Sequence, residues 1–405
     1  MHDLKEEFAD LLEDLSAEEI AAMEQSLVDE GFPPSSIQDL CEVHVEVFED
    51  SLKKTKDEAQ VDGHPIYTYR QENRKLERRI DELDELVKKL KKKGKEHTES
   101  TELIRSKVDE LFTFEKHYQR KENQLFPKLE AKGFTGPTTV MWGKHDEIRD
   151  AMKYLRRALE GDSPASEIKS LFKALKKKME KMIFMEEKIL YPTSLKKLTP
   201  IDWAAIRSEE EEIGYSWATP GSLWDPSLAI KRYRQEHPEE QAGPNIADYL
   251  PGGESGIQNK ADGGIMLDKP IQIPLNEGFL TQEQLDLMLR HLPFDITYVD
   301  EHDKVRYYSA TDDRVFPRTP SIIGRDVQKC HPPKSVHVVK EIVQAFKNKE
   351  RDKAEFWLNF QGRVIHIRYY PIFDKNGTYR GVIEVSQDIT EIQKLSGEHR
   401  LLDWE

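Results

Sequence analysis

Two segments of this 405-residue chain combine side chains that can bind a metal with the same helix-ending sequence. Residues 117–127 read HYQRKENQLFP, and residues 182–192 read MIFMEEKILYP. When the two segments are aligned on their prolines, Glu122 matches Glu187. Carboxylates at matching places on two helices are typical of metal sites inside helix bundles. The two segments are therefore candidates for two halves of one metal site.

The candidate ligands fall on four separate stretches of the chain. They are His64, His117, Glu122, His145, Glu186 and Glu187. Imidazole and carboxylate groups without a thiolate suit iron or manganese, and zinc is a further option. For each histidine taken alone, a hydrogen-bonded position in the core or at the surface is the alternative interpretation.

The spacing of His117 and Glu122 is unusual for two ligands on one helix. Residues five apart lie about 140° apart around a straight helix, whereas residues four apart lie about 40° apart. Lys121 occupies the four-residue offset here. A π-bulge would bring both His117 and Glu122 onto one face, and such bulges are frequent at functional sites. The sequence therefore predicts either a π-bulge at this point or that the two residues do not both bind a metal.

Four long helices would have to position these groups. Apolar residues recur at helical spacing over residues 65–93, 99–130, 138–160 and 165–191, which predicts a helix in each segment. Short breaks that contain glycine or proline separate the segments. Long helices with short connections favour an up-down-up-down bundle. We therefore predict a four-helix bundle over residues 60–195.

These motifs resemble the hemerythrin-like (HHE) cation-binding family. The resemblance lies in the H-x4-E-x2-LFP run, the E-E-x2-LYP run and the histidines on the first three helices, and it covers about residues 60–195. It implies a four-helix bundle that holds a non-haem di-iron centre and binds oxygen or a related small molecule. The ligands that it implies by position are the residues named above, with Glu186 or Glu187 from the last helix.

The chain departs from the family's pattern at three places. The family usually has H-x3-E, and Lys121 stands at that offset here. Arg149 and Met182 stand where a histidine is common. These departures leave a mono-metal site, or a site richer in carboxylates, as alternatives to a complete di-iron centre.

Residues 1–58 predict a small N-terminal helical module, because their apolar residues recur at helical spacing. Residues 24–31 and 37–44 resemble DUF438, a domain of unknown function found ahead of hemerythrin-like bundles. The resemblance implies an architecture and not a mechanism. His44 is expected to be structural, and a place in the metal site is the alternative.

Residues 196–280 interrupt the helical pattern. Apart from a helix expected over residues 201–212, this stretch is rich in glycine, proline and tryptophan and has little periodicity. Loops of this length are usually functional or disordered. We predict an irregular linker that packs on the bundle through Trp203, Trp217 and Trp224.

Residues 281–395 change to the period of β-strands. We predict strands over residues 294–299, 305–309, 355–360, 364–373 and 379–388, with helices over 281–291 and 332–347. This order indicates an α+β domain with one antiparallel sheet. Together with the Gly324-Arg325 turn and the closing Asp388-Ile389-Thr390, it resembles a PAS sensor domain. The resemblance implies a domain that binds a small ligand against the inner face of its sheet, or that dimerises.

Three residues around one predicted turn are candidate cofactor ligands in the PAS-like domain. Cys330, His331 and His337 offer groups that could hold a haem or another small ligand. The alternative interpretation is that this turn only caps a helix. The aromatic residues of the strand over 355–360 are expected to build the core.

The composition limits the classes of partner. The net charge is −15, so a surface that wraps nucleic acid is not expected. No window approaches the roughly 18 uninterrupted apolar residues of a membrane span, and the N-terminus lacks the basic start and apolar run of a signal peptide. The two cysteines are far apart, which fits a reducing compartment. We therefore expect a soluble cytoplasmic protein.

These observations favour a cytoplasmic sensor or signalling protein over an enzyme. Iron in the bundle would report oxygen, nitric oxide or redox state to the PAS-like domain. A homodimer formed through that domain and an unidentified output protein would carry the signal further. The first alternative is a non-haem iron enzyme that reduces oxygen, peroxide or nitric oxide, although no nucleophile motif, phosphate loop or dinucleotide fingerprint is evident. The second alternative is a metal-free interaction scaffold.

Overall fold

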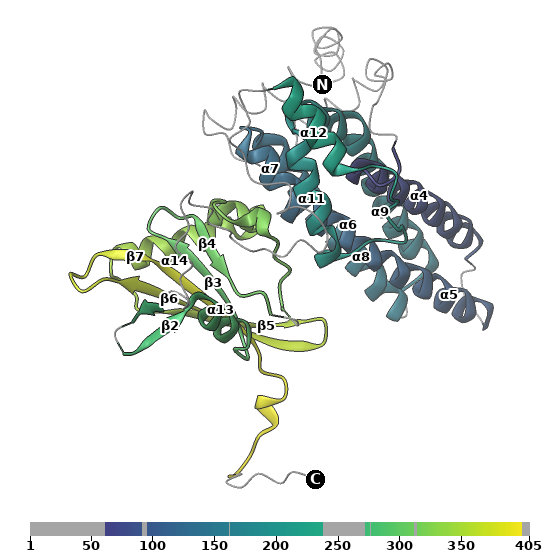
Figure 1. The fold of residues 1–405 in the computed structure, drawn as a ribbon. Helices are drawn as coiled ribbons and strands as arrows, with labels where there is room; N and C mark the ends of the chain where they lie inside the picture. The colour runs from purple at the N-terminus through teal and green to yellow at the C-terminus, as the bar shows by residue number, and fades with distance from the viewer. Residues whose placement is uncertain are drawn as a thin grey trace, which may run out of the picture. The chain divides into compact units, whose positions relative to one another are not determined.

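The computed structural model describes residues 61–90, 95–161, 163–237, 272–275, 277–311 and 314–398. The module predicted over residues 1–58, with His44, lies outside the described residues. The chain divides into two compact units, a helical one and one built on a sheet, which Figure 1 shows as ribbons. The two units are described separately below.

The helical unit is the predicted four-helix bundle, and two of its four helical columns change their winding along their length. The first column is α4 (Pro65–Lys89). The second runs through α5 (Lys95–Leu111), the 3₁₀ turn η2 (Phe112–Phe114), α6 (Glu115–Arg120), the π turn η3 (Lys121–Leu125) and α7 (Phe126–Ala131). The third is α8 (Gly136–Glu160). The fourth runs through α9 (Ala165–Met185), the π turn η4 (Glu186–Leu190) and α10 (Tyr191–Lys197).

The columns close into a ring in which α4 contacts α5, α5 contacts α8, α8 contacts α9, and α9 contacts α4. Each contributes an apolar stripe at helical spacing, as an amphipathic helix buries one face. Leu76 and Ile80 of α4 lie in the same buried cluster as Val108 of α5, Leu155 of α8 and Phe172 of α9. This apolar part of the core makes the bundle a rigid frame for the polar part described below.

Two further helices follow the bundle and correct the prediction of an irregular linker over residues 196–280; the first packs on the bundle, and the second packs on the first. The helix α11 (Pro200–Ile213) was expected, and Thr199 caps it through a capping box. The helix α12 (Pro226–Glu236) was not expected, and the side chain of Asp225 caps it. An N-cap followed by proline is a helix start signal. The sequence therefore contained the signal for α12, and the prediction of irregular structure there was wrong. A short hairpin, β1 (Gln272–Pro274) with β2 (Phe279–Thr281), ends the same stretch.

The three tryptophans of this stretch pack as predicted. Trp203 is buried in the bundle's second apolar cluster, and Trp224 lies against the same cluster. Trp217 packs against the first cluster, and the guanidinium of Arg79 lies over its ring at 4.0 Å from the centroid. We call residues 200–236, which carry the three tryptophans, the covering segment; it is part of the helical unit.

The second unit is the predicted α+β domain with one antiparallel sheet. The strands β3 (Asp295–Asp300), β4 (Val305–Tyr308), β5 (Ala354–Phe360), β6 (Arg363–Phe373) and β7 (Tyr379–Asp388) form a sheet of order β4-β3-β7-β6-β5. All neighbouring strands are antiparallel, with Thr297 opposite Glu384 and Ile367 opposite Ser386. The helices α13 (Gln282–Arg290) and α14 (Val336–Lys347) complete the unit. Val343 and Phe346 of α14 are buried.

The expectation that the aromatic residues of β5 build the core is wrong for two of them. The side chain of Trp357 is 67% exposed and that of Phe356 is 39% exposed. The strand β5 lies at the edge of the sheet, so its residues have a neighbouring strand on one side only. Phe360 is half-buried and lies beside Phe316, with ring centroids 5.5 Å apart.

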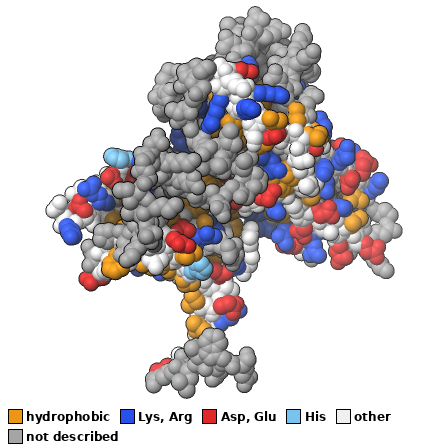
Figure 2. Space-filling view, in the orientation of Figure 1, with side chains coloured by type: hydrophobic (Ala, Val, Ile, Leu, Met, Phe, Trp, Pro, Cys, Tyr) orange, Lys and Arg blue, Asp and Glu red, His pale blue; other side chains and the backbone are white. Residues whose placement is uncertain are grey.

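The surface of the helical unit mixes charges of both signs. Figure 2 shows Lys and Arg side chains interspersed with Asp and Glu side chains over the lobe that holds α5. Lys107 and Glu110 of α5 form one ion pair of this unit, with Nζ and Oε1 3.1 Å apart. Among the described residues, none of the helices is both long and apolar enough to cross a membrane.

Candidate metal centre

Both sequence motifs contain a π turn, as predicted for the first. In η3 the N–H of Phe126 donates to the carbonyl of Lys121, five residues earlier, and in η4 the N–H of Tyr191 donates to that of Glu186. The prolines that follow the aromatic residues supply a local cause. Proline has no N–H to donate to the carbonyl four residues back and its ring crowds that carbonyl, so a widened turn relieves the conflict.

The first π turn directs two successive charged residues into the bundle. Lys121 is 0% exposed and Glu122 is 4% exposed. They follow His117, which is also fully buried, by four and five residues. The N–H of Lys121 bonds to the carbonyl of His117, so the α-type winding continues to this point, and Glu122 lies in the widened turn that begins there. Of the two alternatives that the sequence left open, the π-bulge is present in the structure.

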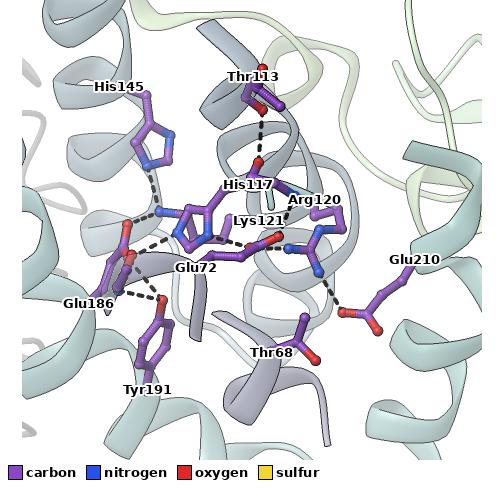
Figure 3. Close-up of polar contacts among 12 residues, drawn as sticks. Thr68, Glu72, Thr113, His117, Arg120, Lys121, His145, Glu186, Tyr191 and Glu210 are labelled. Atoms are coloured by element: carbon purple, nitrogen blue, oxygen red, sulfur yellow. Dashed lines mark hydrogen bonds and ion pairs between the residues drawn. The ribbon is translucent and has the colours of Figure 1, made fainter. Parts of the chain in front are cut away.

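Glu186 of η4 is the hub of a buried polar cluster, drawn in Figure 3. Its Oε2 atom accepts hydrogen bonds from Asn73 Nδ2 and from the Tyr191 hydroxyl, both at 2.8 Å. The same oxygen lies 3.1 Å from His117 Nε2. Its other oxygen, Oε1, pairs with the ammonium group of Lys121. The carboxylate therefore ties the second and fourth columns of the bundle to α4.

His117 lies between two carboxylates. Its Nδ1 atom is 2.7 Å from Glu72 Oε2, on the side opposite Glu186. Glu72 in turn accepts from the backbone N–H of Ser216 at 2.6 Å and pairs with Arg120. The guanidinium of Arg120 also donates to Glu210 of α11 at 2.8 Å. The network therefore extends from the bundle core into its covering helix.

His145 lies between a cation and an anion. Its Nε2 atom is 3.1 Å from Lys121 Nζ, and its Nδ1 atom is 2.7 Å from Glu122 Oε1. An ammonium group can only donate, so Nε2 accepts and Nδ1 carries the proton that is donated to Glu122. The second oxygen of Glu122 accepts from Arg149 Nη2 at 2.9 Å. This arrangement assigns one tautomer to the ring of His145.

Burial and charge lower the pKa values of three groups in the cluster, for different reasons. Burial lowers the pKa of His145 well below its ordinary value, and the neighbouring Lys121 lowers it further. Burial also lowers the pKa of Lys121, against the attraction of Glu186. Burial alone would raise the pKa of Glu186, but the charge of Lys121 and the contact with His117 outweigh it and hold that pKa well below its usual range. The low pKa of Glu186 means that the carboxylate is ionised in the folded protein.

The structure brings together four of the six predicted ligands, namely His117, Glu122, His145 and Glu186. Glu187 is on the outer side of η4, where Arg70 Nε donates to it at 2.9 Å. His64 is elsewhere: it caps α4, accepting from the N–H of Ile66 at 3.2 Å.

The ring of His64 packs between two tryptophans of the covering segment. The ring centroids of Trp203 and Trp224 lie 4.8 Å and 4.9 Å from that of His64. The side chain is buried. The surroundings of His64 are thus those of a packed helix cap.

The four residues that do come together do not fit a metal ion in this arrangement. Throughout the described ranges, no three His, Cys, Asp or Glu side chains are placed so that they could hold one metal ion. The reason lies in their partners: Lys121 engages both Glu186 and His145, and Arg149 engages Glu122. Donor atoms that a metal would need are therefore committed to side-chain cations.

Several members of the cluster were missed by the sequence analysis. They are Glu72, Asn73, Arg120, Tyr191 and Glu210. Glu72 and Asn73 could have been recognised from the sequence as buried polar residues, because they share the face of α4 that buries Tyr69 and Leu76. A charged residue inside an apolar stripe needs a partner. Glu210 gave no such signal, because its partner Arg120 lies ninety residues away.

The candidate cofactor ligands of the second unit do not share one set of contacts. His331 is hydrogen-bonded through Nδ1 to the carbonyl of Val327 at 2.8 Å, and burial lowers its pKa. Cys330 packs against the apolar cluster of the sheet, with Sγ 3.5 Å from the carbonyl of Asp326. His337 is exposed on α14. Cys330 is the last residue of a short 3₁₀ turn (Val327–Cys330), and His331 follows that turn directly. His337 lies at the start of α14.

Three segments of the chain match models of protein families. Residues 64–194 match the hemerythrin HHE cation binding domain, and residues 285–390 match the PAS domain. Residues 1–54 match DUF438, a family of unknown function. Along the chain the matches follow one another as DUF438, hemerythrin HHE and PAS, and they confirm the resemblances that the sequence motifs indicate. A module of a cation-binding family together with a PAS domain is the composition of a sensor or signalling protein.

Solved structures are similar to parts of the chain. A C-terminal domain from Streptococcus mutans is 37% identical over 32% of this chain and 100% of its own, with a TM-score of 0.31. A PAS domain from Colwellia psychrerythraea is 19% identical over 27% of this chain and 97% of its own, with a TM-score of 0.22. The PAS domain of BvgS from Bordetella pertussis is 18% identical over 28% of this chain and 88% of its own, with a TM-score of 0.24. The curated proteins include no match to this chain.

Proposed function

We propose that this chain is a sensor or signalling protein in which the helix bundle is the input module and the PAS domain passes the change on. The observation that supports this best is the buried polar cluster around Glu186. Replacing buried ion pairs by apolar residues of similar volume is often neutral or stabilising. π turns are frequent at functional sites. We therefore infer that a bundle with such a cluster beside two π turns uses the cluster for something other than stability.

Iron is the metal that the family of the bundle suggests, and oxygen, nitric oxide or redox state would be the signal. The donor chemistry of His117, His145 and Glu186 supports this, because imidazole and carboxylate suit iron. An iron-dependent sensor would require Lys121 to release Glu186 and His145, which it engages in the structure.

The same observation favours a second candidate, a metal-free signalling scaffold. In that version the ion pairs of the cluster are themselves the responsive element. The side chains of Glu72, His117, Arg120 and Glu210 link α4, the second column and α11. A partner that binds one arrangement of these helices better than another would shift their equilibrium.

The PAS domain would act by forming a homodimer or by contacting an output protein, and it could hold a small ligand such as haem. His331 supports the ligand only through Nε2, because Nδ1 is hydrogen-bonded to Val327. A cytoplasmic location is part of the proposal. The two cysteines of the chain, Cys41 and Cys330, lie far apart in the sequence, and this fits a reducing compartment.

Hydrogen–deuterium exchange of the full-length protein tests whether the bundle controls the PAS domain. Glu186→Gln removes the charge of the hub with little change in size, and Glu180→Gln is a matched control, because Glu180 is an exposed residue of the same helix. We expect Glu186→Gln, but not Glu180→Gln, to change hydrogen exchange in residues 285–390 as well as in the bundle. Changes confined to residues 61–237 would contradict the proposed coupling.

The same experiment separates the two versions of the signal. The wild-type protein is measured without metal, with anaerobic Fe(II), and with Fe(II) and nitric oxide. A change in residues 285–390 that requires both iron and nitric oxide supports the iron-dependent sensor. A response to Glu186→Gln without any response to iron or nitric oxide supports the metal-free scaffold.

A further inference from the structure

The ammonium group of Lys121 is enclosed by partners at the centre of the bundle. Its side chain is fully buried, and Nζ contacts Glu186 Oε1 and His145 Nε2. The same ammonium lies over the face of Tyr118, 4.8 Å from the ring centroid. An ammonium group has three N–H donors, and an aromatic face attracts a cation. A carboxylate, an imidazole and an aromatic ring therefore surround this charge.

These contacts use the lone pairs that a metal ion would need. His145 presents Nε2 to Lys121 because its Nδ1 proton is donated to Glu122. Neutral imidazole with one free nitrogen is the form that binds metals. In this core that nitrogen is already occupied by a cation of the protein itself. A metal ion would have to displace Lys121 from His145 and from Glu186 together.

The other buried carboxylate among the predicted ligands, that of Glu122, is neutralised in the same way. Glu122 Oε2 accepts from Arg149 Nη2 at 2.9 Å. Arg149 also pairs with Glu115 at 2.9 Å and with Asp146 at 3.0 Å. The positive charges that would come from metal ions in a cation-binding bundle are therefore provided by Arg149 and Lys121.

The two π turns place the two members of the central ion pair at equivalent positions. Lys121 is the first residue of η3, and Glu186 is the first residue of η4. Each is followed by a glutamate, and each turn ends before an aromatic residue and a proline. One half of the pseudo-symmetric motif thus contributes the cation, and the other half contributes the anion.

We propose that Lys121 supplies the cation of this core: its ammonium group stands between Glu186 and His145 in place of a metal ion. The wild-type bundle then stays metal-free, which selects the metal-free version of the proposed function over the iron-dependent one. Removing the ammonium group opens a site for one divalent metal ion, with His117, His145 and Glu186 as its protein ligands.

Metal titration of the full-length protein, stripped with a chelator, tests this proposal. Anaerobic Co(II) is the probe, because its visible spectrum reports protein ligands, and Mn(II) and Fe(II) are titrated in parallel. The variants are Lys121→Met, which removes the charge, and Lys121→Glu, which restores the H-x3-E spacing. Lys153→Met is the matched control, since Lys153 is an exposed residue of α8.

The wild type and Lys153→Met are expected to bind Co(II) only weakly and below one equivalent. Lys121→Met is expected to bind one equivalent at least about 100-fold more tightly, because a buried carboxylate left without its cation is strongly destabilising. Adding Glu186→Gln to Lys121→Met should abolish the gain. Co(II) should raise the melting temperature of Lys121→Met and Lys121→Glu, but not that of the wild type.

Two results would overturn the proposal. One is tight, stoichiometric binding by the wild type that Glu186→Gln removes. The other is equally weak binding by the wild type and both Lys121 variants. If neither variant folds, the wild-type titration still tests the proposal, because the proposal requires that the folded wild type binds no metal ion tightly. The proposed coupling of bundle and PAS domain is tested separately by hydrogen exchange, so either idea can fail alone.

Discussion

Lys121 and Glu186 occupy the same position in two π turns of one bundle, and their side chains pair with each other in its core. The pairing joins the second and fourth columns directly, through two charges that are almost completely buried. Each charge would be costly without the other. The pair therefore determines the charge balance of the cluster, and with it what the bundle can bind.

Removing only one member of this pair should destabilise the metal-free bundle. Lys121→Met leaves Glu186 charged and buried, and we expect a loss of about 3–5 kcal/mol in the free energy of unfolding. Denaturant unfolding of the full chain, followed by far-ultraviolet circular dichroism in a chelator, measures this, because most of the helix is in the bundle. The double variant Lys121→Met with Glu186→Gln should recover much of the loss. A loss below about 1 kcal/mol for Lys121→Met would mean that the pair behaves like an exposed one.

The buried Glu210 should make stability depend on pH. Burial raises the pKa of Glu210 to about 7, against the attraction of Arg120, from an ordinary value of 4.5. Between pH 4.5 and about pH 7 the folded state holds a proton that the unfolded chain has lost. The stabilisation is therefore complete below pH 4.5 and is lost as the pH rises through about 7. The loss is roughly 3 kcal/mol at most, at about 1.4 kcal/mol per pKa unit.

Denaturant unfolding at several pH values between about 4.5 and 8 checks this contribution. Glu210→Gln cannot titrate, and its amide oxygen can still accept from Arg120. The wild type should lose stability relative to Glu210→Gln as the pH rises. The exposed neighbour Glu211 provides the control, and Glu211→Gln should follow the wild type. Parallel curves for all three proteins would show that Glu210 does not titrate in this range.

His64 should behave as a helix cap and not as a metal ligand. His64→Ala removes the acceptor for the N–H of Ile66 and the ring that packs against Trp203 and Trp224. We expect a loss of about 1–2 kcal/mol in stability, and a smaller loss for His64→Asn because asparagine also caps helices. In the Lys121→Met background, His64→Ala should leave Co(II) binding unchanged, whereas His145→Ala should abolish it. Loss of Co(II) binding in His64→Ala would return His64 to the ligand set.

The exposed aromatic residues of β5 should contribute to self-association through the PAS domain. Trp357 and Phe356 are exposed on the edge strand of the sheet, and aromatic residues dominate the energy of protein interfaces. Trp357→Lys is expected to weaken the dimer at least about tenfold in sedimentation velocity at several concentrations. Tyr154→Lys, at an exposed position on α8, is the control. An unchanged dissociation constant for Trp357→Lys would exclude β5 from the contact.

The sequence was sufficient for the parts that depend on local patterns. The periodicity of four apolar stripes predicted the bundle, and alternation with hairpin turns predicted the sheet. The π turn was one of two alternatives that the sequence offered, because His117 and Glu122, five residues apart, can share one face only in a widened helix.

The parts that the sequence did not predict depend on contacts between distant residues. The commitment of His145 Nε2 to Lys121, and of Glu72 to His117, appears only when α4, η3 and α8 are packed together. The six candidate ligands were chosen by residue type, and type alone cannot show that a neighbouring lysine has already taken their lone pairs. Trp357 was placed in the core because edge and central strands look alike in sequence.

The metal content of the freshly purified wild-type protein, measured by mass spectrometry of the elements before and after incubation with Fe(II), tests the central claim most directly. If Lys121 is the cation of the core, iron, manganese and zinc should all remain well below one equivalent per chain, while Lys121→Glu should bind one equivalent. Stoichiometric iron in the wild type that is lost in both His145→Ala and Glu186→Gln would contradict the claim.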